Sequence, residues 1–504
     1  MSFSRSGGVL CHPTSFPGRF GIGDLGKGAH DFIDWLAEAG QQLWQVLPLG
    51  PTGYGDSPYQ CFSAFAGNPL LISPESLAWN GLLPHEALAD APAFPAHAVD
   101  YGWVIDYKHR LFRQSYAHFK AHGPADRRKG FAQFRAQNAD WLDDFALFMA
   151  LKAHFGGGSW HEWPREVRRR EPAVLAKYRA QVAAEAEYQA YLQFVFDDQW
   201  AALKRRAAGR GIQIIGDVPI FAAEDSADVW ASPEQFRLDD EGNPTVVAGV
   251  PPDLFSATGQ RWGNPHYDWD VMRQDGFQWW IRRIRQTLQF VDIVRIDHFR
   301  GFEASWEIPA GEPTAINGRW VRAPGAELFR AVQQALGALP VIAEDLGIIT
   351  PEVDALRLQF GFPGMKVLHF AFGPEFFPPY LPYTYEPNCI VYAGTHDNNT
   401  TVGYWNERSE IEKHNIRRFT GTDAHDIAWD FIRLAWSSVA NQAVATLQDV
   451  MSLGEEARMN YPSRIGGNWQ WRYTADMLTP ALAARLRDFS ETYGRPLKLK
   501  EAAA

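Results

Sequence analysis

Segments in which apolar residues recur every three or four positions alternate along this chain with short runs that are apolar throughout. The first kind of segment predicts amphipathic helices, and the second predicts strands buried on both faces. One helical stripe comprises Phe277, Trp280, Ile281, Ile284 and Leu288, and the run FVDIVRI follows it. This alternation predicts a parallel sheet with helices packed on its faces.

Two further helices are predicted by the same spacing. One stripe runs from Leu328 to Leu336, with Gly337 as its C-cap, and precedes the run PVIAE. Another begins at Tyr188 and ends near Gly209, before the run IQIIGDVPIF. Both repeat the order of helix, short turn and buried strand.

Six apolar runs are predicted to form inner strands: QLWQVLPL, IQIIGDV, VDIVRID, PVIAED, MKVLHFAF and CIVYAGT. Two more strands, needed to close a ring of eight, are placed at Pro69–Ile72 and Arg458–Tyr461. We predict an α/β fold, a (β/α)8 TIM barrel, rather than an open sheet, because acidic residues end several strands and must point to one centre. Residues 1–504 are expected to form a single catalytic domain with no separate C-terminal β-domain.

Two segments interrupt the alternation. Residues 75–195 are rich in alanine, arginine and aromatic residues, with a GGGSWHEWP break, and are predicted to form an inserted helical subdomain. Residues 221–275 are rich in Asp, Pro, Gly and Trp and are predicted to be a loop-rich insertion. Because long loops in compact enzymes are usually functional, we expect this second segment to cover the active site.

Charge and hydropathy argue against two classes of partner. The formal net charge is −11 and the basic residues form no cluster, so nucleic-acid binding is not expected. The chain lacks both an uninterrupted apolar run of membrane-spanning length and the pattern of a signal peptide. Cys11, Cys61 and Cys389 have neither disulfide-framework nor zinc-site spacing, which predicts reduced thiols and a cytoplasmic location.

The segment Gly21–Gly26 matches the glycine pattern of dinucleotide-binding loops and precedes a predicted helix. That pattern indicates a nucleotide site only where a buried strand comes before it and an acidic residue ends the next strand. Here PTSFPGRF precedes it and LWQVLPLG follows. A nicotinamide-dependent enzyme is therefore disfavoured.

Three acidic residues each lie at the C-terminal end of an apolar, β-rich run: Asp297, Glu344 and Asp397. In a barrel of parallel strands this end of every strand opens into the active-site mouth, so the three carboxyl groups should converge. Arg295 lies two residues before Asp297, on the same face of its strand, where its charge favours the ionised carboxylate. Each acid alone could form a structural ion pair or cap a helix. Together they predict chemistry on a glycosidic bond.

The three acids suit different steps of that chemistry. An attacking carboxylate must be ionised at neutral pH, which fits Asp297, whereas a general acid must keep its proton, as Glu344 would if burial and nearby negative charge raise its pKa. Asp397 could accept hydrogen bonds from the hydroxyls of a distorted sugar ring. His298 and His396 are more typical of hydrogen-bonded core histidines, and no spacing predicts a metal site.

A set of motifs that spans nearly the whole chain resembles the 4-α-glucanotransferases, also called amylomaltases or disproportionating enzymes, of the α-amylase superfamily. The motifs are GIGDLG, LPLGPTGYGDSPYQ, SAFAGNP, GDVPIF, FSATGQRWGNP, VRIDHFRG, AEDLG, THDN and GNWQWR. Together these motifs are highly specific, because the GQRWGNP loop is not a general amylase feature. The resemblance implies transfer of α-1,4-glucan segments to the 4-hydroxyl of glucose or another maltodextrin.

The resemblance also implies roles for individual residues. Asp297 corresponds to the nucleophile, Glu344 to the acid/base and Asp397 to the transition-state stabiliser. The implied substrate-binding positions are Tyr59, Asp217, Asp253, Trp262, Arg295, His298, Phe370, His396 and Asn460. Tyr54 and Tyr101 would form a more distant glucan site.

The chain departs from the family pattern at two places. Leu254 stands where the family commonly has Tyr, and Tyr461-Pro462-Ser463 stands where it commonly has Thr-Pro-Gly. Both lie near the expected path of the glucan, so they bear on acceptor preference and product size.

The implied mechanism is a retaining double displacement through a covalent glycosyl-enzyme, which requires carboxyl groups about 5–5.5 Å apart. Its steps are carboxylate attack and proton transfer, so no metal or organic cofactor is expected. Two alternatives are a retaining α-glucan hydrolase, in which water replaces the acceptor, and a non-catalytic glucan-binding protein, which could dispense with Glu344.

Overall fold

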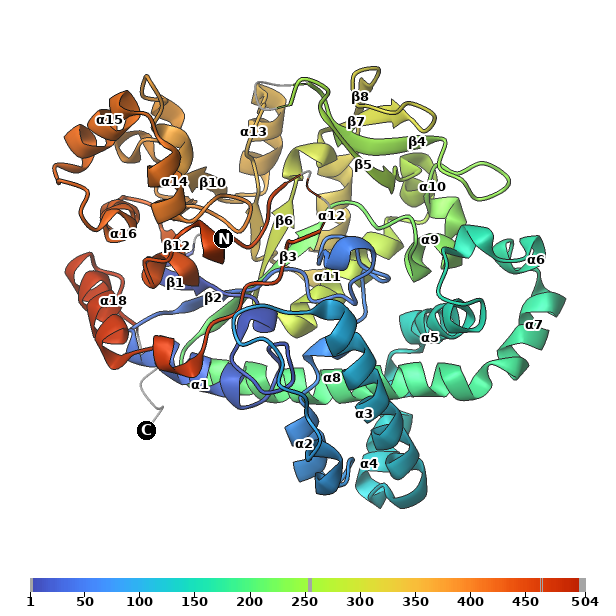
Figure 1. Ribbon diagram of the computed structural model, residues 1–504. Helices are drawn as coiled ribbons and strands as arrows, with labels where there is room; N and C mark the ends of the chain where they lie inside the picture. Colours follow the sequence, from blue (N-terminus) through green and yellow to red (C-terminus); the bar gives the residue numbers. More distant parts are fainter. Residues whose placement is uncertain (1–2, 253–255, 463, 465, 498–504) are drawn as a thin grey trace.

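Eight parallel strands form a barrel at the centre of the computed structural model (Figure 1). The structure describes residues 3–252, 256–462, 464 and 466–497. In spatial order the strands are β10 (Gly364–Val367), β11 (Cys389–Tyr392), β12 (Gln442–Thr446), β1 (Ser6–Leu10), β2 (Leu43–Gln45), β3 (Gln213–Pro219), β6 (Ile293–Asp297) and β9 (Val341–Ala343). The backbone N–H of Ala343 donates to the Pro363 carbonyl at 3.0 Å and joins β9 to the segment leading into β10. The predicted (β/α)8 barrel is confirmed.

Six of the eight strands overlap the predicted runs, and the other two predictions were wrong. Pro69–Leu71 form a 3-10 turn, η3, and residues 458–461 are not a strand. The strands that were missed are β1 and β12, which pair with each other along their whole lengths. Their sequences, SGGVL and QAVAT, contain mostly small residues and so lack the β-branched and aromatic signal of the others. Small residues are required here, since a Cβ on Gly8 would lie 2.4 Å from that of Leu43.

Helices cover the outside of the barrel. They include α1 (Lys27–Glu38), α8 (Ala183–Gly209), α11 (Gln278–Phe290), α12 (Gly325–Leu336), α13 (Pro351–Gln359), α14 (Thr401–Glu407), α15 (Glu410–Thr420), α16 (Ile427–Ser437), α17 (Leu447–Val450) and α18 (Pro480–Thr492). The three helices predicted from apolar spacing correspond to α8, α11 and α12. Gly337 follows α12 with a φ of 83°, a conformation that favours glycine and ends the helix as predicted.

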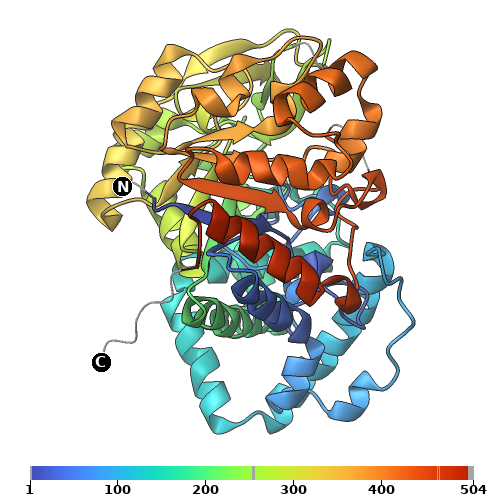
Figure 2. The same ribbon diagram turned by 90° about the vertical axis from the view of Figure 1, so that its left-hand side faces the viewer.

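Additional helices connect β2 to β3. They are α2 (Pro74–Trp79), α3 (Tyr101–His122), α4 (Ala125–Gln137), α5 (Ala139–His154), α6 (Arg165–Arg168) and α7 (Pro172–Gln181). Figure 1 shows α2 to α4 below the barrel and α5 to α7 to its right, and Figure 2 shows this helical part projecting from the lower end of the molecule. The subdomain boundary at residue 195 stays a prediction, since α8 begins before it and continues along the barrel.

A second, antiparallel sheet stands at the upper right of Figure 1. Its strands, in order, are β5 (Gln260–Pro265), β4 (Val246–Val250), β7 (Ala304–Pro309) and β8 (Arg319–Arg322). The segment 221–275, predicted to be loop-rich, contributes β4 and β5 together with the short helices α9 (Ala227–Ala231) and α10 (Trp269–Gln274). The register between β4 and β5 shifts between Val247 and Gly249, so the regular alternation of side chains between the two faces of the sheet is interrupted there.

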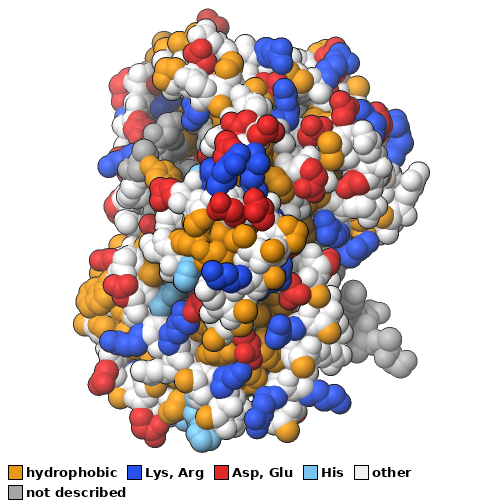
Figure 3. Space-filling model, turned by 90° about the vertical axis from the view of Figure 1, so that its right-hand side faces the viewer, with side chains coloured by type: hydrophobic (Ala, Val, Ile, Leu, Met, Phe, Trp, Pro, Cys, Tyr) orange, Lys and Arg blue, Asp and Glu red, His pale blue; other side chains and the backbone are white. Residues whose placement is uncertain are grey.

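Charges of both signs are interspersed over the face shown in Figure 3, as the scattered basic residues predicted. Arg165, Arg168 and Arg169 all lie within ion-pair distance of Glu241. Across the described part of the chain, no helix combines the length and the apolar character needed to cross a membrane.

Candidate active site

The three predicted catalytic acids lie on the C-terminal side of three barrel strands. Asp297 is the last residue of β6, Glu344 directly follows β9, and Asp397 lies in the loop after β11. Asp217 of β3 is in register with Arg295 of β6, because the two strands pair in parallel. The fold therefore presents these residues at one end of the barrel, the end at which barrel enzymes carry their active sites.

The Arg295 side chain connects Asp217 of β3 to the predicted nucleophile Asp297. This side chain is buried, and Nη1 donates both to Asp217 Oδ2 and, at 3.0 Å, to Asp297 Oδ1. The Tyr59 hydroxyl donates to the same Asp217 oxygen at 2.8 Å. A buried guanidinium shared by two carboxylates fixes the position of Asp297, since charge-assisted hydrogen bonds are strong and directional.

Tyr59 also extends the hydrogen-bond network, through His396, to Asp397. Its hydroxyl oxygen lies 2.8 Å from His396 Nε2, and the two rings stack with centroids 5.4 Å apart. His396 Nε2 is also 3.3 Å from Asp397 Oδ2. Asn460 donates to the other oxygen, Asp397 Oδ1, at 2.6 Å. The side chain of Asp397 is nevertheless 45% exposed, so it remains accessible to a ligand.

Glu344 is held by two backbone donors. The N–H of His298 donates to Oε2 at 2.6 Å, and the N–H of Leu346 donates to Oε1 at 2.8 Å. His298 has a φ of 54°, an uncommon conformation for a residue with a side chain, and it turns the backbone toward Glu344 immediately after β6. Each carboxyl oxygen keeps a second lone pair for further bonding.

Burial raises the pKa of both Asp297 and Glu344. For Asp297 the charge of Arg295 opposes this effect, while Asp217, Glu344 and Asp397 add to it. For Glu344 the opposing groups are Arg295 and the two backbone N–H donors. Burial outweighs the guanidinium, so the pKa of Asp297 lies above its usual value although the charge of Arg295 favours the ionised carboxylate, as predicted. The charge of Glu344 is among the causes that raise the pKa of Asp297, so the titration of one carboxyl group affects that of the other.

A cleft of about 580 Å³ opens in front of these residues, a volume typical of small-molecule sites. Asp297, His298, Asp397 and Trp262 are among its lining residues. The Trp262 ring stands perpendicular to that of His298, with centroids 4.8 Å apart. The other lining residues that the sequence singled out are Tyr54, Tyr59, Asn460, Tyr461 and Pro462. The buried side chains of Asp217, Arg295 and His396 and the half-buried Glu344 are not among the lining residues.

Some sequence predictions fall outside this arrangement. Phe370 lies in the turn η8 (Leu368–Ala371), is 37% exposed and does not line the cleft. The prediction that Tyr101 belongs to a distant glucan site is wrong, because its ring is buried and its hydroxyl donates to the Trp469 carbonyl at 2.8 Å. Its suggested partner Tyr54 lines the cleft itself. Asp253, Leu254 and Ser463 lie outside the described residues.

Two residues of the GNWQWR motif belong to the site although no role was predicted for them. The Trp469 ring lies 5.9 Å from that of Tyr59 and 6.0 Å from that of His396. Asn468 accepts from the N–H of Tyr461 at 2.9 Å and donates to the Arg464 carbonyl at 2.8 Å, which holds one wall of the cleft. The motif itself was the available signal, but these residues follow no strand and no helical spacing.

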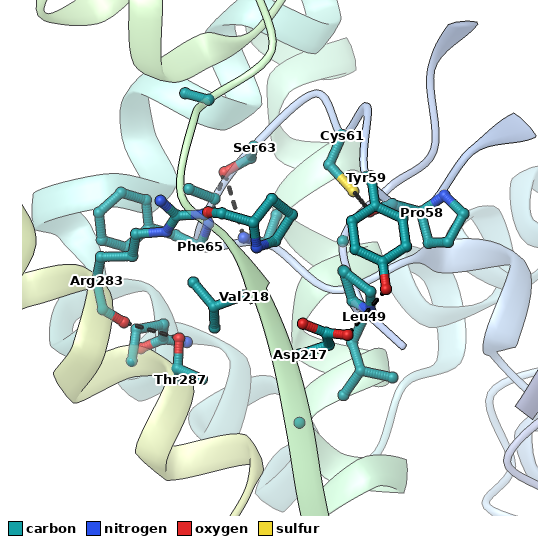
Figure 4. A pocket seen from close by; sticks show the side chains of 18 of the residues that line it. Leu49, Pro58, Tyr59, Cys61, Ser63, Phe65, Asp217, Val218, Arg283 and Thr287 are labelled. Atoms are coloured by element: carbon teal, nitrogen blue, oxygen red, sulfur yellow. Dashed lines mark hydrogen bonds between the residues drawn. The ribbon is translucent and has the colours of Figure 1, made fainter. Parts of the chain in front are cut away.

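A smaller cavity of about 70 Å³ is bordered by Asp217, Tyr59, Val218 and Arg283, among other residues (Figure 4). Figure 4 shows the Asp217 carboxylate reaching the Tyr59 hydroxyl at the edge of this cavity. Asp228 of α9 also lines it. One Asp228 oxygen accepts from the Ala64 N–H at 2.8 Å, and burial raises the pKa of this carboxyl to about 6.

We expect Asp228→Asn to stabilise the protein at pH 8 and to have little effect at pH 4. The pKa of Asp228 is raised in the folded state, so folding binds a proton and stability is lost as pH rises through about 6. The loss above that pH amounts to about 2–3 kcal/mol, which the amide avoids while still accepting from Ala64. Urea unfolding at both pH values measures the difference. Asp270→Asn, on the exposed side of α10, is the control, and an equal gain at pH 4 would contradict the assignment.

A (β/α)8 barrel with three carboxyl groups at the C-terminal ends of its strands fits an enzyme that acts on glycosidic bonds. The model of the 4-alpha-glucanotransferase family matches residues 11–478, and the chain belongs to this family.

Relatives match over nearly the full length. The 4-alpha-glucanotransferases of Thermus thermophilus and of Synechocystis are each 52% identical to this chain; each alignment covers 98% of it, and 100% and 99% of the respective relative. The solved structure of the amylomaltase from Streptococcus agalactiae in complex with acarbose superposes with a TM-score of 0.94 at 39% identity, covering 98% of this chain and 100% of that one. The chain is accordingly a glucanotransferase-family enzyme.

Proposed function

We propose that this enzyme moves α-1,4-glucan segments to the 4-hydroxyl of glucose or another maltodextrin by a retaining double displacement. The observation that carries the proposal is the connected set of carboxyl groups, in which Arg295 bonds Asp297 while Asp397 faces the same cleft. Glu344 accepts from the N–H of His298, the residue directly after Asp297, which supports the proximity of these two acids. The acarbose complex of the Streptococcus agalactiae amylomaltase supports a carbohydrate ligand for this cleft.

In the first step the Asp297 carboxylate attacks the anomeric carbon, and the bond from that carbon to the departing 4-oxygen breaks. Glu344 gives its proton to this oxygen, so the released glucan carries a free 4-hydroxyl. In the second step Glu344 takes the proton from the 4-hydroxyl of the acceptor, whose oxygen displaces Asp297. Two inversions restore the α configuration, as in retaining glycosidases generally.

The surrounding residues position the sugar at which the bond is cleaved. Asp397, fixed by Asn460, accepts from ring hydroxyls as positive charge develops at the anomeric carbon. Tyr59 and His298 flank the same space, and Trp262 limits it on the side of the 221–275 insertion. Exclusion of water by such a cover favours attack by a sugar over hydrolysis.

Incubation with maltotriose tests the proposal against both alternatives. We expect glucose and longer maltodextrins to form while the total number of reducing ends stays constant, because each bond broken is replaced by a new one. A rise in that total would identify a hydrolase instead. Unchanged maltotriose would identify a non-catalytic glucan-binding protein.

We also propose that the enzyme works in the cytoplasm on neutral glucans, without a nucleic-acid or membrane partner. The three cysteines are free thiols, which supports a reducing compartment. The interspersed charges of Figure 3 support the absence of a nucleic-acid partner.

A further inference from the structure

A third, very small cavity borders the loop that carries Asp397. It leaves about 10 Å³ for the centre of a water molecule, which is room for one. The loop residues that line it are Thr395, His396, Asn398, Asn399 and Thr400. Asp397, in the middle of this run, lines the cleft instead. The same loop therefore borders the cleft through Asp397 and the cavity through its neighbours.

Residues that follow β1 supply another part of the cavity wall. His12 and Ser15 both line it, and Ser15 is the last residue of the short turn η1 (Pro13–Ser15). In the barrel, β12 pairs on one side with β1 and on the other with β11, which precedes the Asp397 loop. The cavity therefore lies at the same end of the barrel as the three acids, where the segments after β11, β12 and β1 meet.

Three buried polar atoms on the residues that line this cavity have no hydrogen-bond partner within the described part of the chain. They are His12 Nδ1, Ser15 Oγ and His396 Nδ1. The residues that carry them are at most 4% exposed. A buried polar atom without a partner costs free energy, and buried water molecules commonly supply the missing bonds. One water molecule has two hydrogens and two lone pairs, enough for all three atoms.

The hydrogen bonds on the opposite side of the His396 ring determine which nitrogen carries the proton. Tyr59 has one hydroxyl proton and donates it to Asp217, so its oxygen accepts from His396 Nε2. The Asp397 carboxylate, 3.3 Å from the same nitrogen, is also an acceptor. Burial lowers the pKa of His396, which favours the neutral ring. A neutral ring that is protonated at Nε2 is an acceptor at Nδ1, so Nδ1 requires a donor.

We propose that one buried water molecule binds in this cavity and donates to His396 Nδ1, and that His12 and Ser15 are positioning residues that hold it. The water keeps the His396 proton on Nε2, where it orients the Tyr59 hydroxyl and the Asp397 carboxylate. His12 and Ser15 thus act on the reaction only through His396. This inference rests on the role proposed for Asp397.

Crystal structures at a resolution that shows ordered water test the binding itself. For the wild type we expect a density peak within hydrogen-bond distance of His396 Nδ1, Ser15 Oγ and His12 Nδ1. In Ser15→Ala the peak should be lost or displaced. A cavity without density in the wild type would overturn the inference whatever the activity. Failure of the wild type to transfer glucosyl units from maltotriose would instead overturn the proposed function.

Kinetics with maltotriose test the positioning role. Ser15→Ala and His12→Leu remove atoms that hold the water, and we expect each to lower kcat by about tenfold, the size of one lost hydrogen bond. KM should change by less than about twofold, because neither residue lines the cleft. His12→Asn should recover most of the lost kcat, because its amide places a polar atom near the position of Nδ1.

Ser115→Ala is the matched control. Ser115 of α3 is as fully buried as Ser15, and its hydroxyl bonds to the Leu82 carbonyl and to Tyr191. This variant should lower the melting temperature about as much as Ser15→Ala but keep the wild-type kcat. Wild-type kcat in Ser15→Ala and His12→Leu would overturn the inference. An equal loss of kcat in His12→Asn and His12→Leu, or in Ser115→Ala and Ser15→Ala, would also overturn it, because either result indicates a loss of packing.

Discussion

Glu344→Gln is expected to lower the rate of transfer between maltodextrins by about 10³-fold, the usual contribution of a general acid and base. Glutamine has the size of glutamate and can still accept from the His298 N–H, so the loop should keep its shape. It cannot give a proton to the leaving 4-oxygen or take one from the acceptor. The rate with maltotriose measures the loss, and Glu352→Gln, on the exposed surface of α13, is the control.

The role of Glu344 is tested more directly with a donor that needs no acid. With α-maltosyl fluoride the glycosyl-enzyme on Asp297 should still form in Glu344→Gln and should accumulate, because no base activates the acceptor. Azide, which needs no base, should then release α-maltosyl azide. Near wild-type activity on maltotriose would refute the acid/base assignment.

Asp297→Ala is expected to reduce transfer by about 10⁴-fold or more, since removal of a nucleophile abolishes the covalent route. No glycosyl-enzyme should be detected by mass spectrometry. Azide can enter the space that the carboxylate leaves and attack α-maltosyl fluoride directly, which gives β-maltosyl azide. The two variants should therefore yield azides of opposite configuration, and the same configuration from both would contradict the assigned roles. A melting temperature close to that of the wild type shows that the variant is folded.

The parts of the fold that the sequence predicted are those with a strong side-chain signal. The strands around Asp297 and Glu344 are rich in β-branched residues and end in charged ones, so both their type and their ends could be predicted. The strand pair β1 and β12 could not, because its small residues are selected by close packing against neighbours that only the folded barrel brings near. In the same way, η3 at Pro69–Leu71 reads as an apolar run although its backbone forms a turn.

The site shows a similar division. The acids were predictable because strand ends converge in a barrel, whereas the link from Tyr59 through Asp217 to Arg295 joins three separate elements and follows from no spacing. Trp469 was missed because its contacts with Tyr59 and His396 also join separate parts of the chain. The effect of Arg295 on Asp297 could be predicted because a neighbouring arginine can be read from the sequence, whereas the burial that raises the pKa of Asp297 could not.

The pairing of β1 with β12 also constrains how the chain reaches its native state. During synthesis β1 must wait for residues 442–446 before its second neighbour exists. Until then both borders of the incomplete ring offer unpaired backbone groups, which favour association between nascent chains. Contacts of such long sequence separation also slow folding. Synthesis of a fragment that stops before residue 442 should thus yield an aggregating product rather than a partly active one.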